Sequence, residues 1–192
     1  MKAPIDFYFD FSSPFSYLAS QKIETLAARH GRTVKWRPML LGAAFKATGA
    51  LPLTQIPLKG EYAKRDFARS ARFHGLHYRH PEPFPVSTVA ACRAFYSLEN
   101  EEAAIRFAKA VFHAYFSDNI NIGEPHNVLR IAATAGVTPD IQSQAVKDRT
   151  KAEVDAALAR GVFGSPYIVV DGEPFWGLDR FDQMERWLQA PF

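Results

Sequence analysis

The chain has 192 residues, of which 47% are hydrophobic and 22% are charged. This length allows one domain with a sizeable core, and the balance of apolar and charged residues excludes both a disordered chain and a membrane-embedded one. The formal net charge of +3 comes from Lys and Arg residues that are scattered among acids, so we expect a small anionic substrate and no nucleic acid as the partner.

The N-terminal segment, MKAPIDFYFDF, lacks the uninterrupted apolar run of a signal peptide because Asp6 and Asp10 lie within it. No later stretch approaches the roughly 18 apolar residues of a membrane-spanning helix. We therefore expect a cytoplasmic protein with no membrane partner.

The first elements predict a β-α-β unit. Side chains alternate over residues 4–11, which is typical of a strand. Ser13 is a good N-cap, Pro14 suits the first position of a helix, and apolar residues recur at helical spacing until Gly31. Residues 33–37, TVKWR, predict a second strand that Pro38 ends. Such a unit implies parallel strands with a right-handed crossover.

The middle of the chain predicts helices only: one ending near Thr48, then helices near 60–74, 86–98, 101–116 and 125–135. A further helix is expected over 139–160, with a break near Asp148. Residues 161–177, GVFGSPYIVVDGEPFWG, predict a loop, a strand, a hairpin turn at Asp171-Gly172 and a short strand. Residues 180–188 predict a terminal helix.

This order predicts an α/β fold, a thioredoxin-like β-α-β / α-β-β-α domain interrupted by a large all-helical insertion. We assign residues 1–38 and 139–192 to the thioredoxin-like domain and residues 39–138 to the helical insertion domain. In that arrangement the loop before the third strand lies against the start of the first helix.

The junction of the first strand and the first helix is the candidate site. A helix N-terminus presents unpaired N–H groups and the positive end of the helix dipole, which stabilise a thiolate. Thioredoxin-type proteins carry Cys-x-x-Cys there, whereas this chain has Ser13-Pro14-Phe15-Ser16. Two serines exclude disulfide exchange, and Ser16 has no redox role, but the Ser13 hydroxyl can donate to the sulfur of a thiol cofactor. The alternative is an ordinary Ser-Pro helix start.

Ser165 and Pro166 form the second half of this candidate site, since they stand directly before the third predicted strand. We predict a cis peptide bond at Pro166. A cis bond would leave the backbone of Ser165 free to pair with an extended peptide ligand, as in strand addition.

Six segments carry a resemblance to a known family: FYFDFSSPFSYLA at the start, KWRPMLLG at 35–42, KGEYAKRD at 59–66, FPVST at 84–88, IGEPHNVL at 122–129 and GVFGSPYIVVDGEPFWGLDR at 161–180. With these segments the chain resembles the 2-hydroxychromene-2-carboxylate isomerases, which are close to kappa-class glutathione transferases and more distantly related to DsbA-type oxidoreductases. The resemblance runs essentially end to end. It implies glutathione as the cofactor, a small aromatic carboxylate as the substrate, and a homodimer.

The resemblance also implies which residues bind glutathione: Ser13, Lys59, Ser165, Pro166, Leu178 and Asp179. Ser13 would contact the sulfur, and Ser165, before the cis proline, would pair with the cysteinyl backbone. Leu178 and Asp179 would hold the γ-glutamyl end, with Asp179 meeting its ammonium group. Lys59 would face the glycine carboxylate.

The implied reaction interconverts 2-hydroxychromene-2-carboxylate and trans-o-hydroxybenzylidenepyruvate by thiolate addition, bond rotation and elimination. Lys35 and Arg37, at the end of the second predicted strand, are the cations expected near the substrate carboxylate, and Arg37 is preferred for its bidentate fork. The alternative for both is a pair of solvated strand-end charges. Kappa-class transferases have an asparagine where this chain has Ala50 after Gly49, which favours the isomerase.

Two other functions remain open: a kappa-like transferase or peroxidase that consumes glutathione, and a non-catalytic protein that binds thiol peptides. The spacing of His74, His77 and His80 suggests a metal, but Gly75 breaks the helix that would align them and no cysteine or acid cluster completes a site, so we expect none. Cys92 lies in an apolar helical stretch and is expected to be a buried structural residue; as the single cysteine it excludes an internal disulfide.

Overall fold

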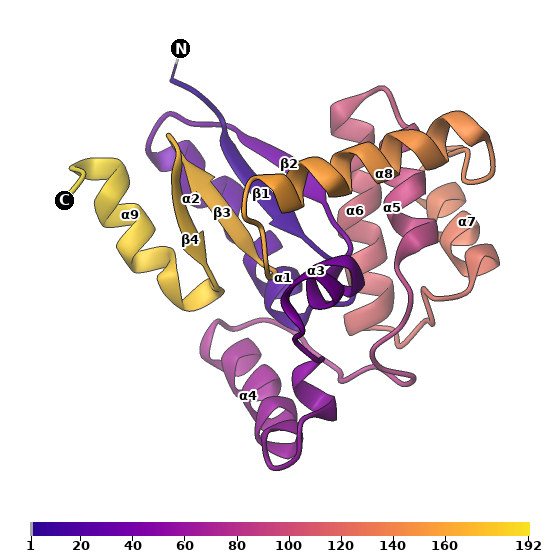
Figure 1. Cartoon of the computed structure of the whole chain (residues 1–192), viewed down its shortest axis with the longest axis horizontal. Coiled ribbons are helices and arrows are strands. Elements are labelled where there is room, and N and C mark those ends of the chain that lie inside the picture. The colour runs from indigo at the N-terminus through magenta and orange to yellow at the C-terminus, as the bar shows by residue number, and fades with distance from the viewer. Residues whose placement is uncertain (1) are drawn as a thin grey trace.

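A mixed four-stranded sheet lies at the centre of the computed structural model, which describes residues 2–192 (Figure 1). Its order is β2-β1-β3-β4, formed by β1 (Ile5–Phe9), β2 (Val34–Pro38), β3 (Tyr167–Val170) and β4 (Glu173–Trp176). β1 pairs in parallel with β2, as the predicted β-α-β unit requires, and antiparallel with β3. β3 and β4 form the predicted hairpin.

The hairpin turn is formed by Asp171 and Gly172, whose φ angles are 52° and 94°. Positive φ at both central residues is typical of a type I′ turn, which Asp-Gly favours. The Asp171 carboxylate also pairs with the Arg32 guanidinium, which precedes β2. This ion pair ties the far end of the hairpin to the start of the second strand.

The first predicted helix is two helices, α1 (Pro14–Ser20) and α2 (Ile23–Arg29), so the single helix expected until Gly31 is wrong. The buried Ser20 hydroxyl donates to the Tyr17 carbonyl oxygen at 2.6 Å. Side-chain bonds of this kind compete with the backbone ladder of a helix. α1 is therefore only seven residues long.

The segment between the two blocks of the sheet is helical, as predicted. It comprises α3 (Leu41–Thr48), the short 3-10 helix η1 (Leu53–Gln55), α4 (Lys59–Phe73), α5 (Val89–Ser97), α6 (Glu101–Phe116) and α7 (Pro125–Thr134). α5, α6 and α7 lie together beside the sheet, whereas α4 projects below it (Figure 1).

α8 (Gln144–Ala159) crosses one face of the sheet without interruption, so the predicted break near Asp148 is wrong (Figure 1). The helix also begins later than predicted. The Asp140 carboxylate accepts from the backbone N–H groups of Gln142 and Ser143, which holds residues 140–143 in a turn. Ser143 is the N-cap and accepts from the N–H of Val146 at 3.3 Å. The 3-10 helix η2 (Leu178–Arg180) and α9 (Phe181–Gln189) close the chain.

An aromatic core joins the sheet to the helical segment. Phe9 of β1 lies 5.5 Å from Phe112 of α6 between ring centroids, and Phe11 lies 5.3 Å from the same ring. All three side chains are fully buried. Cys92 of α5 is also fully buried in this cluster. The strand that carries the candidate site is therefore packed against both parts of the chain.

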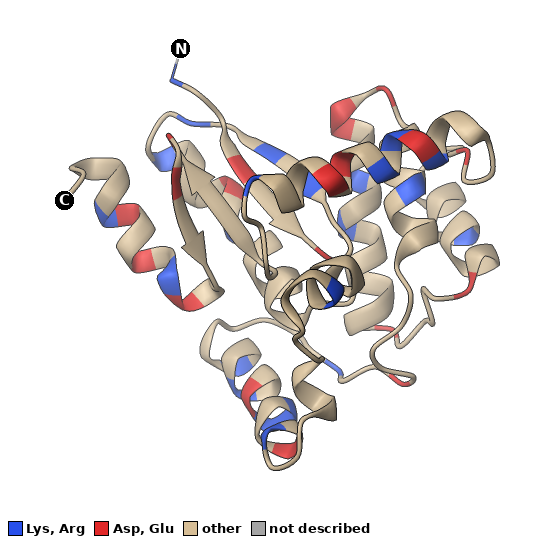
Figure 2. Ribbon diagram, in the orientation of Figure 1, with Lys and Arg blue, Asp and Glu red and all other residues tan. Residues whose placement is uncertain are grey.

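Charged residues of both signs alternate along α4, α8 and α9 (Figure 2). Within residues 2–192, no helix combines the length and the apolar character needed to cross a membrane.

Candidate functional site

Three serine side chains meet where α1 begins. Ser13 caps the helix, because its Oγ accepts the backbone N–H of Ser16 at 3.2 Å. The Ser13 hydroxyl donates to the carbonyl oxygen of Ser165 at 3.0 Å, across 152 residues of sequence. The hydroxyls of Ser16 and Ser165 lie 2.5 Å apart. The structure thus brings together the two halves of the site that the sequence predicts.

The peptide bond between Ser165 and Pro166 is cis, as predicted. The Pro166 carbonyl accepts from the backbone N–H of Gly177 at 3.0 Å. This bond places η2 beside the loop that carries Ser165 and Pro166, hereafter the proline loop. Among residues 2–192, the backbone N–H of Ser165 donates no intramolecular hydrogen bond. It is therefore available to an extended ligand.

Asp10, at the end of β1, holds the loop beneath these serines. Its buried carboxylate accepts from the backbone N–H of Leu41 at 2.7 Å, from the N–H and hydroxyl of Ser12 at 2.7 and 2.8 Å, and from the hydroxyl of Thr88. Burial raises the pKa of Asp10 above its ordinary value, and these hydrogen bonds oppose the shift. Its backbone N–H donates to the Oγ of Ser165 at 2.7 Å.

The structural role of Asp10 was not predicted. Its two distant partners lie at the N-termini of α3 and α5, so the residue fastens the helical segment to the site. The sequence does carry a signal for this role, because an acidic residue follows an aromatic strand directly before the site. A carboxylate buried at such a position needs several hydrogen-bond donors.

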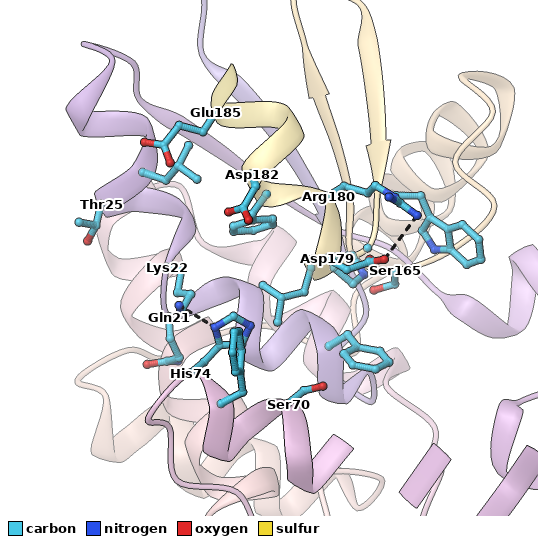
Figure 3. A pocket seen from close by; sticks show the side chains of 18 of the residues that line it. Gln21, Lys22, Thr25, Ser70, His74, Ser165, Asp179, Arg180, Asp182 and Glu185 are labelled. Atoms are coloured by element: carbon cyan, nitrogen blue, oxygen red, sulfur yellow. Dashed lines mark hydrogen bonds and ion pairs between the residues drawn. The ribbon is translucent and has the colours of Figure 1, made fainter. Parts of the chain in front are cut away.

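A groove of about 1260 Å³ opens beside the proline loop, between α1 and α2, α4, and the segment that follows β4 (Figure 3). Phe15, Phe73 and Trp176 supply aromatic walls. Its polar lining residues come from these elements and the loop before β3: Gln21, Lys22, Thr25, Arg29, Asp66, Ser70, His74, Ser165, Asp179, Arg180, Asp182 and Glu185.

Four of the predicted glutathione residues line this groove: Ser165, Pro166, Leu178 and Asp179. The Leu178 side chain is buried, whereas that of Asp179 is 73% exposed and lies 3.5 Å from the Arg180 guanidinium. Ser13 is 5% exposed and is not a lining residue; it lies behind Ser165, to which it is hydrogen-bonded.

Lys59 lies outside the lining of the groove. It is the first residue of α4 and is exposed, and Leu53 of η1 lines the groove instead. The predicted contact of Lys59 with the glycine carboxylate stays a prediction.

The structure does not bring Lys35 and Arg37 to the groove. Arg37 donates from Nε to the Asp6 carboxylate at 2.6 Å, lies 3.8 Å from the Glu153 carboxylate of α8, and stands over the ring of Tyr8. Lys35 is exposed two residues earlier on the same strand, so it points to the same face. Their contact with a substrate carboxylate stays a prediction as well.

The far end of the groove carries a polar pair that was not predicted. The Lys22 ammonium lies 2.8 Å from Nδ1 of His74, with Asp182 and Glu185 on the opposite wall (Figure 3). Burial and the neighbouring Lys22 lower the pKa of His74. The imidazole is therefore neutral near pH 7, and its Nδ1 accepts the ammonium proton.

The DSBA-like thioredoxin domain family matches residues 4–189 of the chain. A 2-hydroxychromene-2-carboxylate isomerase of Sphingobium xenophagum is 32% identical, over 98% of this chain and 99% of that protein. A 2-hydroxychromene-2-carboxylate isomerase of Pseudomonas putida is 30% identical, over 94% and 92%. Glutathione S-transferase kappa 1 of Caenorhabditis elegans is 27% identical, over 97% and 91%.

The fold is also similar to that of a solved 2-hydroxychromene-2-carboxylate isomerase. The TM-score is 0.85 at 29% identity, over 96% of this chain and 94% of that one. The predicted thioredoxin-like α/β fold class and the predicted resemblance are therefore confirmed.

Proposed function

This chain belongs to the DSBA-like thioredoxin domain family, and from that premise we propose that it is an isomerase that uses glutathione to interconvert 2-hydroxychromene-2-carboxylate and trans-o-hydroxybenzylidenepyruvate. The observation that carries the proposal is the junction of Ser13 with Ser165 and the cis Pro166 on the wall of the groove. Relatives at 32% and 30% identity are named for this isomerase activity.

The residues of the groove fit glutathione. The hydroxyl of Ser13 suits an anionic sulfur at the start of α1, and the free N–H of Ser165 suits the peptide backbone of an extended ligand. The exposed carboxylate of Asp179 suits an ammonium group. The groove, at about 1260 Å³, is larger than the roughly 300–1,000 Å³ of a typical ligand pocket and leaves room for an aromatic substrate.

When bound, glutathione supplies a thiolate that adds reversibly to the conjugated double bond of the substrate, so that the bond can rotate before the thiolate leaves. The chain's own residues hold the reacting groups. Ser13 keeps a hydroxyl at the start of α1, and Ser165 fixes the ligand backbone against the helix. Phe15, Phe73 and Trp176 offer apolar surface to an aromatic ring.

A hydroxyl donor adds to the thiolate stabilisation that the end of the helix supplies. A free thiol with a pKa of about 8.5 is only a few per cent ionised at pH 7. The end of a helix lowers a thiol pKa by up to about 1.5 units, and the effect is local to the first turn. α1 has only seven residues. A hydrogen bond to a charged group contributes a further 1.5 kcal/mol or so, which is about one pKa unit.

A kappa-like glutathione transferase or peroxidase is the second candidate, supported by the relatives of the kappa class. In that reaction glutathione is consumed, whereas in the isomerisation it is regenerated. A non-catalytic protein that binds thiol peptides would bind glutathione without turning over any substrate.

The test follows the ultraviolet spectrum of 2-hydroxychromene-2-carboxylate after enzyme and glutathione are added, with total thiol measured at the start and at the end. We expect conversion towards the trans isomer with the thiol concentration unchanged. Conversion that depletes the thiol in step with the substrate would favour the transferase, and an unchanged spectrum together with measurable glutathione binding would favour the binding protein.

We further propose that the protein is a cytoplasmic homodimer with no nucleic-acid or membrane partner, as the resemblance and the composition imply. Leu51, Leu58 and Tyr62 expose apolar surface on the helical segment, which supports a contact between subunits. Light scattering would show a mass of twice the chain if this is correct and the mass of one chain if it is wrong.

A further inference from the structure

The role expected of Ser165, pairing with the ligand backbone, uses only its main chain. Its side-chain hydroxyl also lies in the site and has no role in that pairing. Its Oγ lies 2.5 Å from the Oγ of Ser16 and accepts the backbone N–H of Asp10 at 2.7 Å. Ser165 lines the groove, whereas Ser13 and Ser16 do not. A ligand that enters from the groove therefore meets Ser165 first.

The direction of the hydrogen bond between Ser16 and Ser165 follows from burial. Ser16 is 0% exposed, and among residues 2–192 its hydroxyl has no other hydrogen-bond partner than the Oγ of Ser165. If Ser165 were the donor, the proton of Ser16 would be left buried and unpaired, which is unfavourable. Ser16 is therefore the donor, and Ser165 the acceptor.

The remaining proton of Ser165 then has no acceptor in the described part of the chain. Its Oγ already accepts two hydrogen bonds, one from the N–H of Asp10 and one from the hydroxyl of Ser16. A hydroxyl has one proton to donate and can accept two bonds, so both acceptor positions are filled. The proton can only be directed into the groove.

The proton of Ser13, in contrast, has an acceptor. It is donated to the carbonyl oxygen of Ser165 at 3.0 Å, and a carbonyl can only accept. For Ser13 to donate to a sulfur, this bond must first be broken. Ser165 needs no such rearrangement.

We propose that the side-chain hydroxyl of Ser165 donates a hydrogen bond to the sulfur of the bound thiolate, alongside Ser13, and that Ser16 and the backbone N–H of Asp10 hold it in the orientation to do so. The inference rests on the proposed function, since it requires a bound thiol. In this arrangement Ser16, which occupies the position of a resolving cysteine, orients the Ser165 hydroxyl.

The test measures the thiol pKa of bound glutathione from thiolate ultraviolet absorbance in the wild type and in Ser165→Ala, Ser165→Thr and Ser13→Ala. We expect Ser165→Ala to raise this pKa by about one unit, because a hydrogen bond to a charged acceptor is lost. Ser165→Thr retains a hydroxyl and should restore the wild-type value. Ser13→Ala should remove only part of the amount by which the wild-type protein lowers the thiol pKa.

Affinities give a second readout that does not depend on turnover. The dissociation constant for glutathione should rise roughly tenfold in Ser165→Ala, in step with the change in thiol pKa, while that for S-methylglutathione, which has no thiolate, should stay unchanged. Circular dichroism checks that the variants fold. Should Ser165→Ala fail to fold, Ser165→Gly, which also removes the hydroxyl, replaces it in both measurements.

Three results would overturn the inference. If Ser165→Ala binds glutathione with the same thiol pKa as the wild type, the Ser165 hydroxyl makes no contact with the sulfur. Complete loss of the lowering in Ser13→Ala would leave no role for a second donor. No binding of glutathione to the wild type would overturn the inference and the proposed function together, which separates this case from the other two.

Discussion

Serine replaces cysteine at both ends of the motif that begins α1, and the two serines do different work. Ser13 caps the helix and bridges to the proline loop, whereas the buried Ser16 contacts the side chain of Ser165. Neither can form a disulfide, so this motif cannot carry out the thiol–disulfide exchange of a Cys-x-x-Cys pair. In the function that we propose, the reacting sulfur comes from bound glutathione.

Asp10→Asn tests how the site is fastened to the helical segment. All the side-chain partners of Asp10 donate, so an amide would turn its NH₂ group towards another donor, the N–H of either Leu41 or Ser12. We expect the free energy of unfolding to fall by about 1–3 kcal/mol, because a buried donor is left unpaired. Denaturant unfolding measures the change.

Asp179→Asn is the matched control, since it alters an exposed acid on the same groove and should have little effect on stability. An Asp10→Asn protein as stable as the wild type would contradict this account of Asp10. It would mean that removing a buried charge compensates for the donor that is left unpaired.

At the scale of elements, the predictions from sequence succeeded where the signal was local. The Asp171-Gly172 turn, the Ser13 cap and the helices from α4 to α7 depend on neighbouring residues. The break between α1 and α2 and the late start of α8 depend on single side chains, Ser20 and Asp140, that bond to the nearby backbone. Such bonds leave no trace in hydrophobic periodicity.

The same distinction between local patterns and long-range contacts applies to the residues of the candidate site. Ser13 and Ser165 could be predicted, because a strand-to-helix junction and a proline before a strand are both local patterns. The pairing of Lys22 with His74 joins residues 52 positions apart, and the place of Arg37 is set by acids on β1 and α8. Those contacts exist only once the elements are assembled, so the sequence could not place Arg37 between Asp6 and Glu153.

The β3–β4 hairpin gives a prediction on pH. The hydrogen bond with Arg32 lowers the pKa of Asp171 below 3.8, so the ion pair stabilises the folded protein above that pH and its contribution is lost as the pH falls through the folded-state value. We expect Asp171→Asn to lower the free energy of unfolding at pH 7 by less than about 1 kcal/mol, because Asp171 is half exposed.

Asparagine tolerates the positive φ of this position, so the variant isolates the charge. Unfolding free energies of the two proteins, measured from pH 7 downwards, should converge below pH 3.8. A difference that stays constant with pH would show that the turn, and not the ion pair, is responsible.

At the scale of the whole molecule, the sheet and the helical segment share one core around Phe9, Phe11 and Phe112. We expect the two parts to unfold together. Phe112→Ala should lower the free energy of unfolding by about 3–5 kcal/mol, and a single transition should remain. Far- and near-ultraviolet circular dichroism, followed in the same denaturant series, would check that the transitions coincide.

Phe73→Ala is the control for the loss of an aromatic ring, since Phe73 is 84% exposed and should contribute little to stability. Two separate transitions in the wild type or in Phe112→Ala would contradict a shared core. They would indicate a helical domain that folds independently of the sheet.

In the function that we propose, glutathione bound beside Ser13 and Ser165 makes the chain an isomerase. The most direct measurement is the initial rate of isomerisation of 2-hydroxychromene-2-carboxylate as a function of glutathione concentration, at fixed enzyme and substrate. We expect a rate that is negligible without glutathione, rises with the glutathione concentration and saturates. A rate that is the same at every glutathione concentration, or that is absent at all of them, would contradict this proposal.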